Sequence, residues 1–217
     1  MQNDQTIEYY KKRAMEYDKI YFRDDPVRQG ELTYLYNLSK RILNDRNVLD
    51  IACGTGFWTR ILSETASSII GVDINEATLE VARNKKYDCP TDYRTGDVLS
   101  LNNLPENLDG LLATFVISHV KREDLASLRE KIKKTLKPGC PAFFCDNNLI
   151  CELKPELIPD PKSVNTYKVR ELENGDEYTI LKNYFEPDEL REIFSSWGKI
   201  NDFYFEKYYW AVSLSLE

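Results

Sequence analysis

The sequence predicts an α/β fold, and two observations support this prediction. Between about Val48 and Asp146, short β-branched runs alternate with stretches whose apolar residues recur at helical spacing, the pattern of successive βαβ units. The first of these runs leads directly into a turn of small residues, Cys53-Gly54-Thr55-Gly56. Because strands joined by helices run parallel, we expect a mostly parallel sheet with helices on both faces.

The segment before this unit, Thr6 to Leu43, predicts two helices. Asp25-Pro26 separates them, because proline starts a helix more readily than it continues one. The first helix is unusually rich in aromatic hydroxyl groups, with Tyr9, Tyr10, Tyr17 and Tyr21.

The central unit predicts five strands and three helices. The expected strands are Val48–Ile51, Ser68–Asp73, Asp92–Thr95, Gly110–Val116 and Ala142–Asp146. The expected helices are Trp58–Ser63, Glu76–Lys85 and Glu123–Thr135. Lys137-Pro138-Gly139 ends the third helix, since proline and glycine both stop helices.

The last third of the chain predicts a loop, a hairpin, a helix and two strands. Three prolines mark Leu153–Pro161 as a loop, and Asn174-Gly175 suits the tight turn of a β-hairpin. The predicted hairpin strands are Tyr167–Leu172 and Glu177–Leu181, and the helix runs from Pro187 to about Trp197. Two aromatic strands, Ile200–Phe205 and Tyr208–Leu214, are expected to pair antiparallel at the edge of the sheet.

Size and charge limit the classes of function. The chain has 217 residues, of which 42% are hydrophobic and 30% charged, which favours one folded domain. Its 29 Lys and Arg against 36 Asp and Glu give a net charge of −7. An acidic chain without a basic segment disfavours nucleic acids and anionic membranes as partners.

The cysteines and the hydropathy pattern indicate a compartment. The five cysteines form no Cys-x-x-Cys pair and are odd in number, so neither a zinc site nor a disulfide framework is expected. The polar start of the chain and the lack of a long apolar run predict neither a secretory signal nor a membrane span. We therefore expect a cytoplasmic protein.

The strand–turn–helix that begins at Val48 predicts a nucleoside site. Gly54 and Gly56 let a ligand approach bare backbone, and Asp73, at the end of the second strand, can bind both hydroxyls of a ribose. The Gly-x-Gly-x-x-Gly of dinucleotide folds is missing, since Thr59 stands at its third glycine. Asp50 would repel a phosphate but suits a cationic group, so the expected cofactor is a nucleoside without phosphates.

These residues resemble the class I S-adenosylmethionine-dependent methyltransferases, with Ala52 in place of the first motif glycine. The similarity extends to Gly71-Val72-Asp73-Ile74, Gly96-Asp97-Val98, Phe115–Val120 and Leu136-Lys137-Pro138-Gly139. It implies a Rossmann-like sheet of seven strands, mostly parallel with an antiparallel last strand. One domain is expected over 1–217, with an N-terminal helical lid (1–46), a cofactor-binding half (47–147) and a substrate-side part (148–217).

The resemblance also implies roles for single residues. Asp73 would hold the ribose, Asp97 and Val98 the adenine, and Asp50 with Arg13 the methionine end of S-adenosylmethionine. The leader Glu8–Tyr21 would close over the cofactor. The expected cofactor-binding residues are Tyr10, Arg13, Asp50, Ala52, Gly54, Gly56, Asp73, Ile74, Asp97, Val98 and Phe115.

His119 is the candidate catalytic base. It is the only histidine, and it follows the fourth strand at the edge where α/β sites form. An imidazole with an ordinary pKa near 6.5 can take a proton from an acceptor hydroxyl or amine. The alternative is a histidine that caps the next helix or bonds to backbone.

The acceptor class is limited by motifs that are missing. Thr114-Phe115-Val116-Ile117 replaces the Asn/Asp-Pro-Pro-Tyr/Phe of adenine methyltransferases, and no cysteine stands where cytosine C5 enzymes place a nucleophile. Asp146-Asn147 offers half of the magnesium site of catechol-type enzymes, but the fourth strand offers none, so no metal is expected. We expect methyl transfer to oxygen or nitrogen of a small molecule. The alternatives are a non-catalytic S-adenosylmethionine-binding protein and a protein or RNA methyltransferase.

Overall fold

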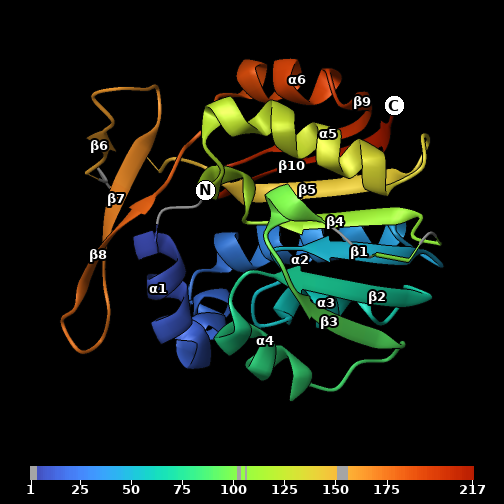
Figure 1. Cartoon of the computed structure of the whole chain (residues 1–217), viewed down its shortest axis with the longest axis horizontal. Coiled ribbons are helices and arrows are strands. Elements are labelled where there is room, and N and C mark those ends of the chain that lie inside the picture. Colours follow the sequence, from blue (N-terminus) through green and yellow to red (C-terminus); the bar gives the residue numbers. More distant parts are fainter. Residues whose placement is uncertain (1–3, 102–103, 106, 151–155) are drawn as a thin grey trace.

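A computed structural model describes residues 4–101, 104–105, 107–150 and 156–217 of the chain. Its main sheet has seven strands in the order β3-β2-β1-β4-β5-β10-β9, and only β10 runs antiparallel to its neighbours (Figure 1). The strands are β1 (Asn47–Ile51), β2 (Ser68–Asp73), β3 (Thr91–Thr95), β4 (Gly110–Thr114), β5 (Pro141–Asn147), β9 (Gly198–Phe205) and β10 (Tyr209–Leu216). The predicted Rossmann-like fold with an antiparallel last strand is therefore confirmed.

Six α-helices and four short 3₁₀ segments complete the described part of the chain. The helices are α1 (Asp4–Arg13), α2 (Pro26–Ile42), α3 (Phe57–Leu62), α4 (Glu76–Arg83), α5 (Leu125–Thr135) and α6 (Pro187–Ser195). The 3₁₀ segments are η1 (Ala14–Phe22), η2 (Val98–Ser100), η3 (Ile117–His119) and η4 (Arg122–Asp124).

The predicted break before Pro26 is confirmed. Asp25 caps α2, since its side chain accepts a hydrogen bond from the Arg28 N–H at 3.0 Å, and Pro26 occupies the first turn, where its missing N–H costs nothing. The segment before the break differs from a single α-helix, because α1 gives way to the 3₁₀ segment η1 after Arg13.

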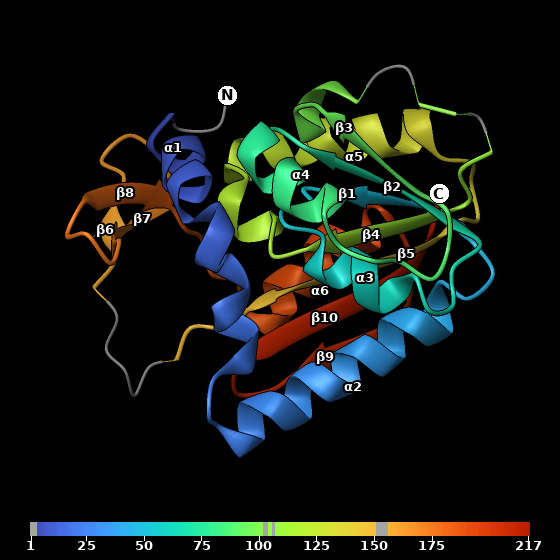
Figure 2. The same ribbon diagram turned by 90° about the horizontal axis from the view of Figure 1, so that it is seen from below.

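The central strands bury side chains on both faces. Successive residues of a strand point in opposite directions, so Leu111 packs with α5 and α6 on one face, while Leu112 packs with α2 and α3 on the other. Phe144 and Phe143 of β5 divide in the same way. Figures 1 and 2 show these helix layers on either side of the sheet. This explains why the central strands are continuously apolar.

The fourth strand is shorter than predicted. It ends at Thr114 rather than Val116, because Phe115 adopts a left-handed backbone conformation with φ 56°. A bulky residue rarely takes this conformation, which turns the chain out of the sheet and into η3. Thus His119 lies in a short 3₁₀ turn directly above the carboxyl end of β4.

The predicted hairpin is confirmed and forms a separate small sheet. β7 (Thr166–Glu171) and β8 (Glu177–Leu181) pair antiparallel, and Gly175 takes the positive φ of 86° that the turn requires. Within the predicted loop, the two-residue β6 (Ile158–Pro159) adds a third strand, while residues 153–155 lie outside the described part. In both views α1 lies between this small sheet and the main sheet (Figures 1 and 2).

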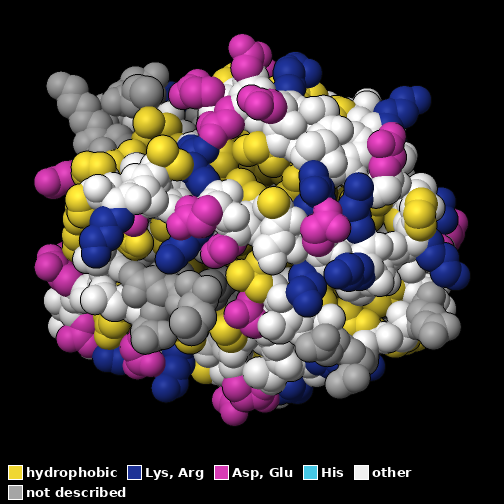
Figure 3. Space-filling model, turned by 45° about the horizontal axis from the view of Figure 1, so that its top comes forward, with side chains coloured by type: hydrophobic (Ala, Val, Ile, Leu, Met, Phe, Trp, Pro, Cys, Tyr) yellow, Lys and Arg dark blue, Asp and Glu magenta, His cyan; other side chains and the backbone are white. Residues whose placement is uncertain are grey.

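The surface over α5 and α6 carries both charges interspersed, without a large patch of one sign (Figure 3). Among the described residues, no helix is long and apolar enough to cross a membrane. Cys53, Cys89, Cys140 and Cys145 are free thiols, and Cys151 lies outside the described residues.

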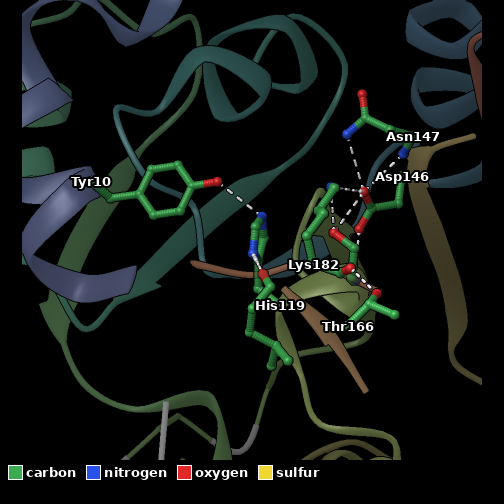
Figure 4. A network of polar contacts seen from close by, with 8 residues as sticks. Tyr10, His119, Asp146, Asn147, Thr166 and Lys182 are labelled. Carbon is green, nitrogen blue, oxygen red and sulfur yellow. Dashed lines mark hydrogen bonds and ion pairs between the residues drawn. The ribbon is translucent and has the colours of Figure 1, made fainter. Parts of the chain in front are cut away.

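A buried ion pair connects the small sheet to the main sheet. Asp146, at the end of β5, is fully buried, and Lys182, just after β8, is 3% exposed. The Lys182 Nζ lies 3.2 Å from Asp146 Oδ1 and donates to Ser118 Oγ at 2.6 Å (Figure 4). Ser118 in turn donates its N–H and its hydroxyl to the Asp146 carboxylate, at 2.9 and 3.0 Å. The three residues therefore join β5, η3 and β8.

We predict that Lys182→Met lowers the free energy of unfolding by about 3–5 kcal/mol, because it leaves the buried Asp146 carboxylate without a counter-charge. Adding Asp146→Asn should recover part of this loss, since the two sites are in contact and not additive. Denaturant unfolding measures both. Lys162→Met, which removes an exposed lysine beside the same small sheet, is the control and should cost less than about 0.5 kcal/mol. If Lys182→Met and Lys162→Met lowered the free energy of unfolding equally, the buried ion pair would not be the stabilising contact.

Candidate active site

The turn after β1 contains three left-handed residues, Ala52 (φ 53°), Gly54 (φ 55°) and Gly56 (φ 73°). For alanine this conformation costs about 1 kcal/mol. Gly56 must lack a side chain, because a Cβ there would lie 2.5 Å from the hydroxyl of Tyr87. A Cβ on Gly54 would meet no atom within 4 Å. The chain therefore leaves open space against the backbone at Gly54.

Asp73, at the end of β2, holds this turn in place. Its Oδ2 accepts the N–H of Gly54 at 2.9 Å, and its Oδ1 accepts the N–H of Asn75 at 2.8 Å and the hydroxyl of Thr78 at 3.3 Å. Burial raises the pKa of Asp73, while these hydrogen bonds oppose the shift. The carboxylate thus fixes both the glycine turn and the start of α4.

A cavity of about 830 Å³, measured to its open mouth, lies at the carboxyl ends of β1, β2 and β4. This is the point where the strand order reverses between β1 and β4, the usual place for ligands in open α/β sheets. The cavity is lined by Thr6, Ile7, Tyr10, Tyr17, Tyr21, Ala52, Cys53, Gly54, Thr55, Phe57, Trp58, Asp73, Ile74, Asn75, Thr78, Val98, Thr114, Phe115, Val116 and His119.

The cavity brings together most of the expected cofactor-binding residues. Those that line it are Tyr10, Ala52, Gly54, Asp73, Ile74, Val98 and Phe115. The other four lie outside its wall. Asp50 lies within β1, and Gly56 is the last residue of the turn, at the start of α3. Asp97 caps η2 by accepting the Leu99 N–H at 2.9 Å, and Arg13 lines an adjoining cavity.

The leader contributes more side chains to the cavity than expected. Thr6 and Ile7 of α1 line it beside Tyr10, and Tyr17 and Tyr21 of η1 follow. Thr55 ties the leader down, since its hydroxyl donates to Asp18 at 2.5 Å. The excess of tyrosine in this segment signalled a ligand contact, but the switch to 3₁₀ geometry after Arg13 changes which residues share a face.

Two buried polar groups at this site have no hydrogen-bond partner among the described residues. Trp58 lines the cavity, and its Nε1–H is unpaired. Asp50 is fully buried, accepts the Thr59 hydroxyl at 2.6 Å through Oδ2, and leaves Oδ1 unpaired. Burial raises the pKa of Asp50 to about 7. The unpaired Trp58 donor and the open backbone at Gly54 fit a nucleoside with polar groups, whereas the unpaired Asp50 oxygen lies outside the cavity wall.

Tyr10 and His119 form a hydrogen-bonded pair at the edge of this cavity. His119 Nδ1 lies 2.7 Å from the carbonyl oxygen of Leu181, which only accepts, so Nδ1 carries the proton (Figure 4). His119 Nε2 therefore accepts the Tyr10 hydroxyl at 2.9 Å. Burial and then the positive charge of Lys182 lower the pKa of His119 to about 3. Burial also raises the pKa of Tyr10 well above its usual range, so both groups are neutral at physiological pH.

A second cavity adjoins the first on the side of the small sheet. The two share a wall formed by Tyr10, Tyr17, Tyr21, Phe115 and His119. The second cavity extends from this wall to β7 and to the residues that follow β5. The two cavities therefore lie next to each other, with these five side chains in common.

The described residues include no cluster of three or more His, Cys, Asp or Glu side chains that could hold a metal ion. Asp146, which would supply half of a magnesium site in catechol-type enzymes, binds Lys182 and Ser118 instead. The expectation that the chain uses no metal stays a prediction.

Comparison with known proteins agrees with this geometry. Residues 48–139 match the family model described as "Methyltransferase domain". A ubiquinone biosynthesis O-methyltransferase of Chelativorans sp. (strain BNC1) is 30% identical over 156 residues, 70% of this chain and 58% of that protein. A cypemycin N-terminal methyltransferase of Streptomyces sp. is 32% identical over 108 residues, 49% of this chain and 44% of that protein. The chain spans less than half the length of the first curated relatives that it matches.

The fold has close structural neighbours. The solved "DhpI-SAM-HEP complex" superposes with a TM-score of 0.77 at 22% sequence identity, over 97% of this chain and 95% of that one. At this identity the likeness shows the fold. The family match covers the glycine turn, Asp73 and the strands that build the cavity. Residues 48–139 of the chain therefore form a methyltransferase domain of the class I S-adenosylmethionine-dependent type.

Proposed function

We propose that the chain transfers a methyl group from S-adenosylmethionine to an oxygen or nitrogen of a small-molecule acceptor. One observation carries the proposal: a cavity built on the glycine turn and Asp73 meets a second cavity at a wall that contains Tyr10 and His119. The first cavity suits the cofactor and the second suits the acceptor. The named activities of the ubiquinone and demethylmenaquinone relatives, which concern small molecules, support the same class.

The residues of the first cavity have distinct roles in this proposal. The Asp73 carboxylate would hold the ribose hydroxyls, and Ile74 and Val98 would pack against the adenosine. The open backbone at Gly54 allows close approach of the methionine end, and Trp58 Nε1 offers an unpaired donor. Asp50 and Arg13 are expected at the methionine end. Asp50 would act there indirectly, through the glycine turn that follows it, and Arg13 would act from the adjoining cavity. Bound S-adenosylmethionine supplies an electrophilic methyl group on a cationic sulfur.

Tyr10 and His119 would take up the proton that the acceptor loses. The Tyr10 hydroxyl donates a hydrogen bond to His119 Nε2. The lone pairs of its oxygen can therefore accept a hydrogen bond from the O–H or N–H of the methyl acceptor. As the acceptor oxygen or nitrogen binds the methyl group, its proton would move to Tyr10 Oη and the proton of Tyr10 to Nε2. Because burial and Lys182 lower the pKa of His119 to about 3, the ring would hold this proton only transiently and release it to solvent. The bond from His119 Nδ1 to Leu181 keeps the ring in the tautomer that this transfer needs.

The leader and the wall aromatics would exclude water from the reaction. Tyr17 and Tyr21 lie in both cavities, and Tyr21 stacks on Phe57 with ring centroids 3.9 Å apart. Aligning acceptor, methyl and sulfur in a dry site supplies most of the rate that such a transfer needs from the protein.

Isothermal titration with S-adenosylhomocysteine and S-adenosylmethionine tests the cofactor site directly, and saturable binding of both is expected. We predict that Asp73→Ala weakens this affinity about 10- to 100-fold, because it removes charge-assisted hydrogen bonds. Asp92→Ala, which removes an exposed carboxylate of β3, is the matched control and should bind as the unchanged chain does. Because Asp73 also holds the turn, thermal unfolding of each variant is measured alongside.

Two outcomes would overturn the proposal. If neither cofactor binds at millimolar concentration, the first cavity is misassigned. If both bind but no acceptor in a broad panel yields S-adenosylhomocysteine, the chain is a binding protein and not an enzyme.

We predict that His119 does not titrate between pH 5 and 8. The chain has a single histidine, so the imidazole ¹H–¹⁵N signals of an untagged protein are unambiguous. They should show the Nδ1-protonated tautomer throughout, since burial lowers the pKa to about 3. A midpoint near pH 6.5 would show that the ring is open to solvent and would contradict the buried pair.

The same shift predicts how stability depends on pH. Unfolded His119 binds a proton below about pH 6.5, whereas the folded ring does not until about pH 3. The unfolded state therefore gains protons first, and stability falls as the pH drops from 6.5 towards 3, by up to about 1.4 kcal/mol per pH unit. Denaturant unfolding at several pH values checks this. His119→Asn keeps a donor for Leu181 and should remove this part of the slope.

A further inference from the structure

The second cavity has a charge opposite to that of the whole chain. Although the net charge is −7, seven cationic side chains line this cavity, against three carboxylates from Glu16, Glu171 and Glu173. The seven come from the leader, α2, β7 and the segment after β8: Arg13, Lys19, Arg23, Arg28, Lys168, Arg170 and Lys182. An acidic protein has thus concentrated positive charge in one hollow.

Among the described residues, two of the seven cations form an ion pair with a carboxylate. Lys182 is paired with the buried Asp146. Lys19 lies 3.5 Å from Glu16 and 2.9 Å from Glu173, which also accounts for two of the three lining carboxylates. The remaining carboxylate, that of Glu171, is exposed. The other five cations therefore form no ion pair within the part of the chain that the structure describes.

Two of these five are held in place by tyrosines. Arg13 donates to the Tyr9 hydroxyl at 2.5 Å, and Arg28 donates to the Tyr209 hydroxyl at 3.2 Å while its guanidinium lies 4.2 Å from the ring centroid of Tyr208. Tyrosine hydroxyls and rings position a guanidinium but do not remove its charge. Each arginine keeps further N–H donors for a ligand.

The other three form no side-chain hydrogen bond or ion pair with any described residue. They are Arg23, which directly follows η1, and Lys168 and Arg170 of β7. Lys168 and Arg170 lie two residues apart and therefore on the same face of that strand. Burial lowers the pKa of Lys168, and the charges of Arg170, Lys182 and Arg23 lower it further. These like charges repel one another across the cavity, an arrangement that is costly unless an anion enters it.

We infer that the acceptor carries an oxyanion, a phosphate, phosphonate or carboxylate group, which Arg23, Lys168 and Arg170 bind in the second cavity. This inference rests on the proposed function and names the class of its substrate. Guanidinium groups bind such oxyanions in a bidentate manner, and a lysine adds a point charge. The proposed anion site and the reacting group would then lie in the same cavity.

This arrangement would orient the acceptor. The cations of β7 and Arg23 would bind the anionic end, while Tyr10 and His119 at the wall would receive the group to be methylated. Because the shared wall also borders the cofactor cavity, an acceptor anchored by its charge presents its other end to the methyl group. Fixing both ends reduces the entropy lost at the transition state.

The test is isothermal titration with inorganic phosphate and, separately, acetate, at low ionic strength, with and without saturating S-adenosylhomocysteine. We expect saturable phosphate binding that weakens as salt is added. The double variant Lys168→Gln, Arg170→Gln should lose at least about tenfold in phosphate affinity, since it removes two charge-assisted contacts. Tighter phosphate than acetate binding supports a phosphate or phosphonate acceptor, and the reverse supports a carboxylate.

Lys162→Gln is the matched control, since it removes an exposed lysine near β7 that does not line the cavity, and it should bind phosphate as the unchanged chain does. If phosphate and acetate both fail to bind, or if the double variant and the control bind phosphate equally well, the inference is wrong. The proposed function still stands in that case, provided that S-adenosylhomocysteine binding is unchanged. If only the cofactor fails to bind, the proposed function fails and the anion site stands. An RNA oligonucleotide that binds more tightly than phosphate would overturn the small-molecule acceptor.

Discussion

The architecture of the site depends on one buried interaction, the contact of Lys182 with Asp146 and Ser118. The Asp146 carboxylate is completely buried, and burial alone would raise its pKa. The charge of Lys182, with N–H groups from Ser118 and Asn147, holds the pKa below its usual range instead. A buried charge that needs this many partners tolerates only one arrangement of them. The position of the small sheet is therefore tied to the main sheet at the point where the cavities meet.

That constraint also determines the chemistry of the neighbouring histidine. Leu181, whose carbonyl fixes the proton on His119 Nδ1, directly precedes Lys182. The lysine charge helps to keep the ring neutral, so the same residue that anchors β8 leaves Nε2 with a free lone pair for Tyr10. The anchor of the small sheet and the tautomer of His119 thus depend on two adjacent residues, Lys182 and Leu181.

The fold was predictable from sequence because its signals are local. The glycine turn, the Asn174-Gly175 hairpin and the Asp25-Pro26 break each depend on backbone preferences of a few adjacent residues. The wall of the site was less predictable, because it depends on contacts between distant segments. Spacing along a regular helix could not show that the leader changes to 3₁₀ geometry after Arg13, nor that the left-handed Phe115 ends β4 early. Lys182 belongs to no motif, and its contact with Ser118 and Asp146 appears only in three dimensions.

Charge shows the same limit most clearly. A long polyanion would contact much of the surface at once, so the net charge of −7 is the quantity that governs its electrostatic attraction or repulsion. A small anion meets only its immediate surroundings, because salt screens charges beyond about 8–10 Å. Within that range, Arg23, Lys168 and Arg170 dominate the second cavity. A chain with a net negative charge can therefore still present a cationic hollow to a small anion, and composition alone does not predict this hollow.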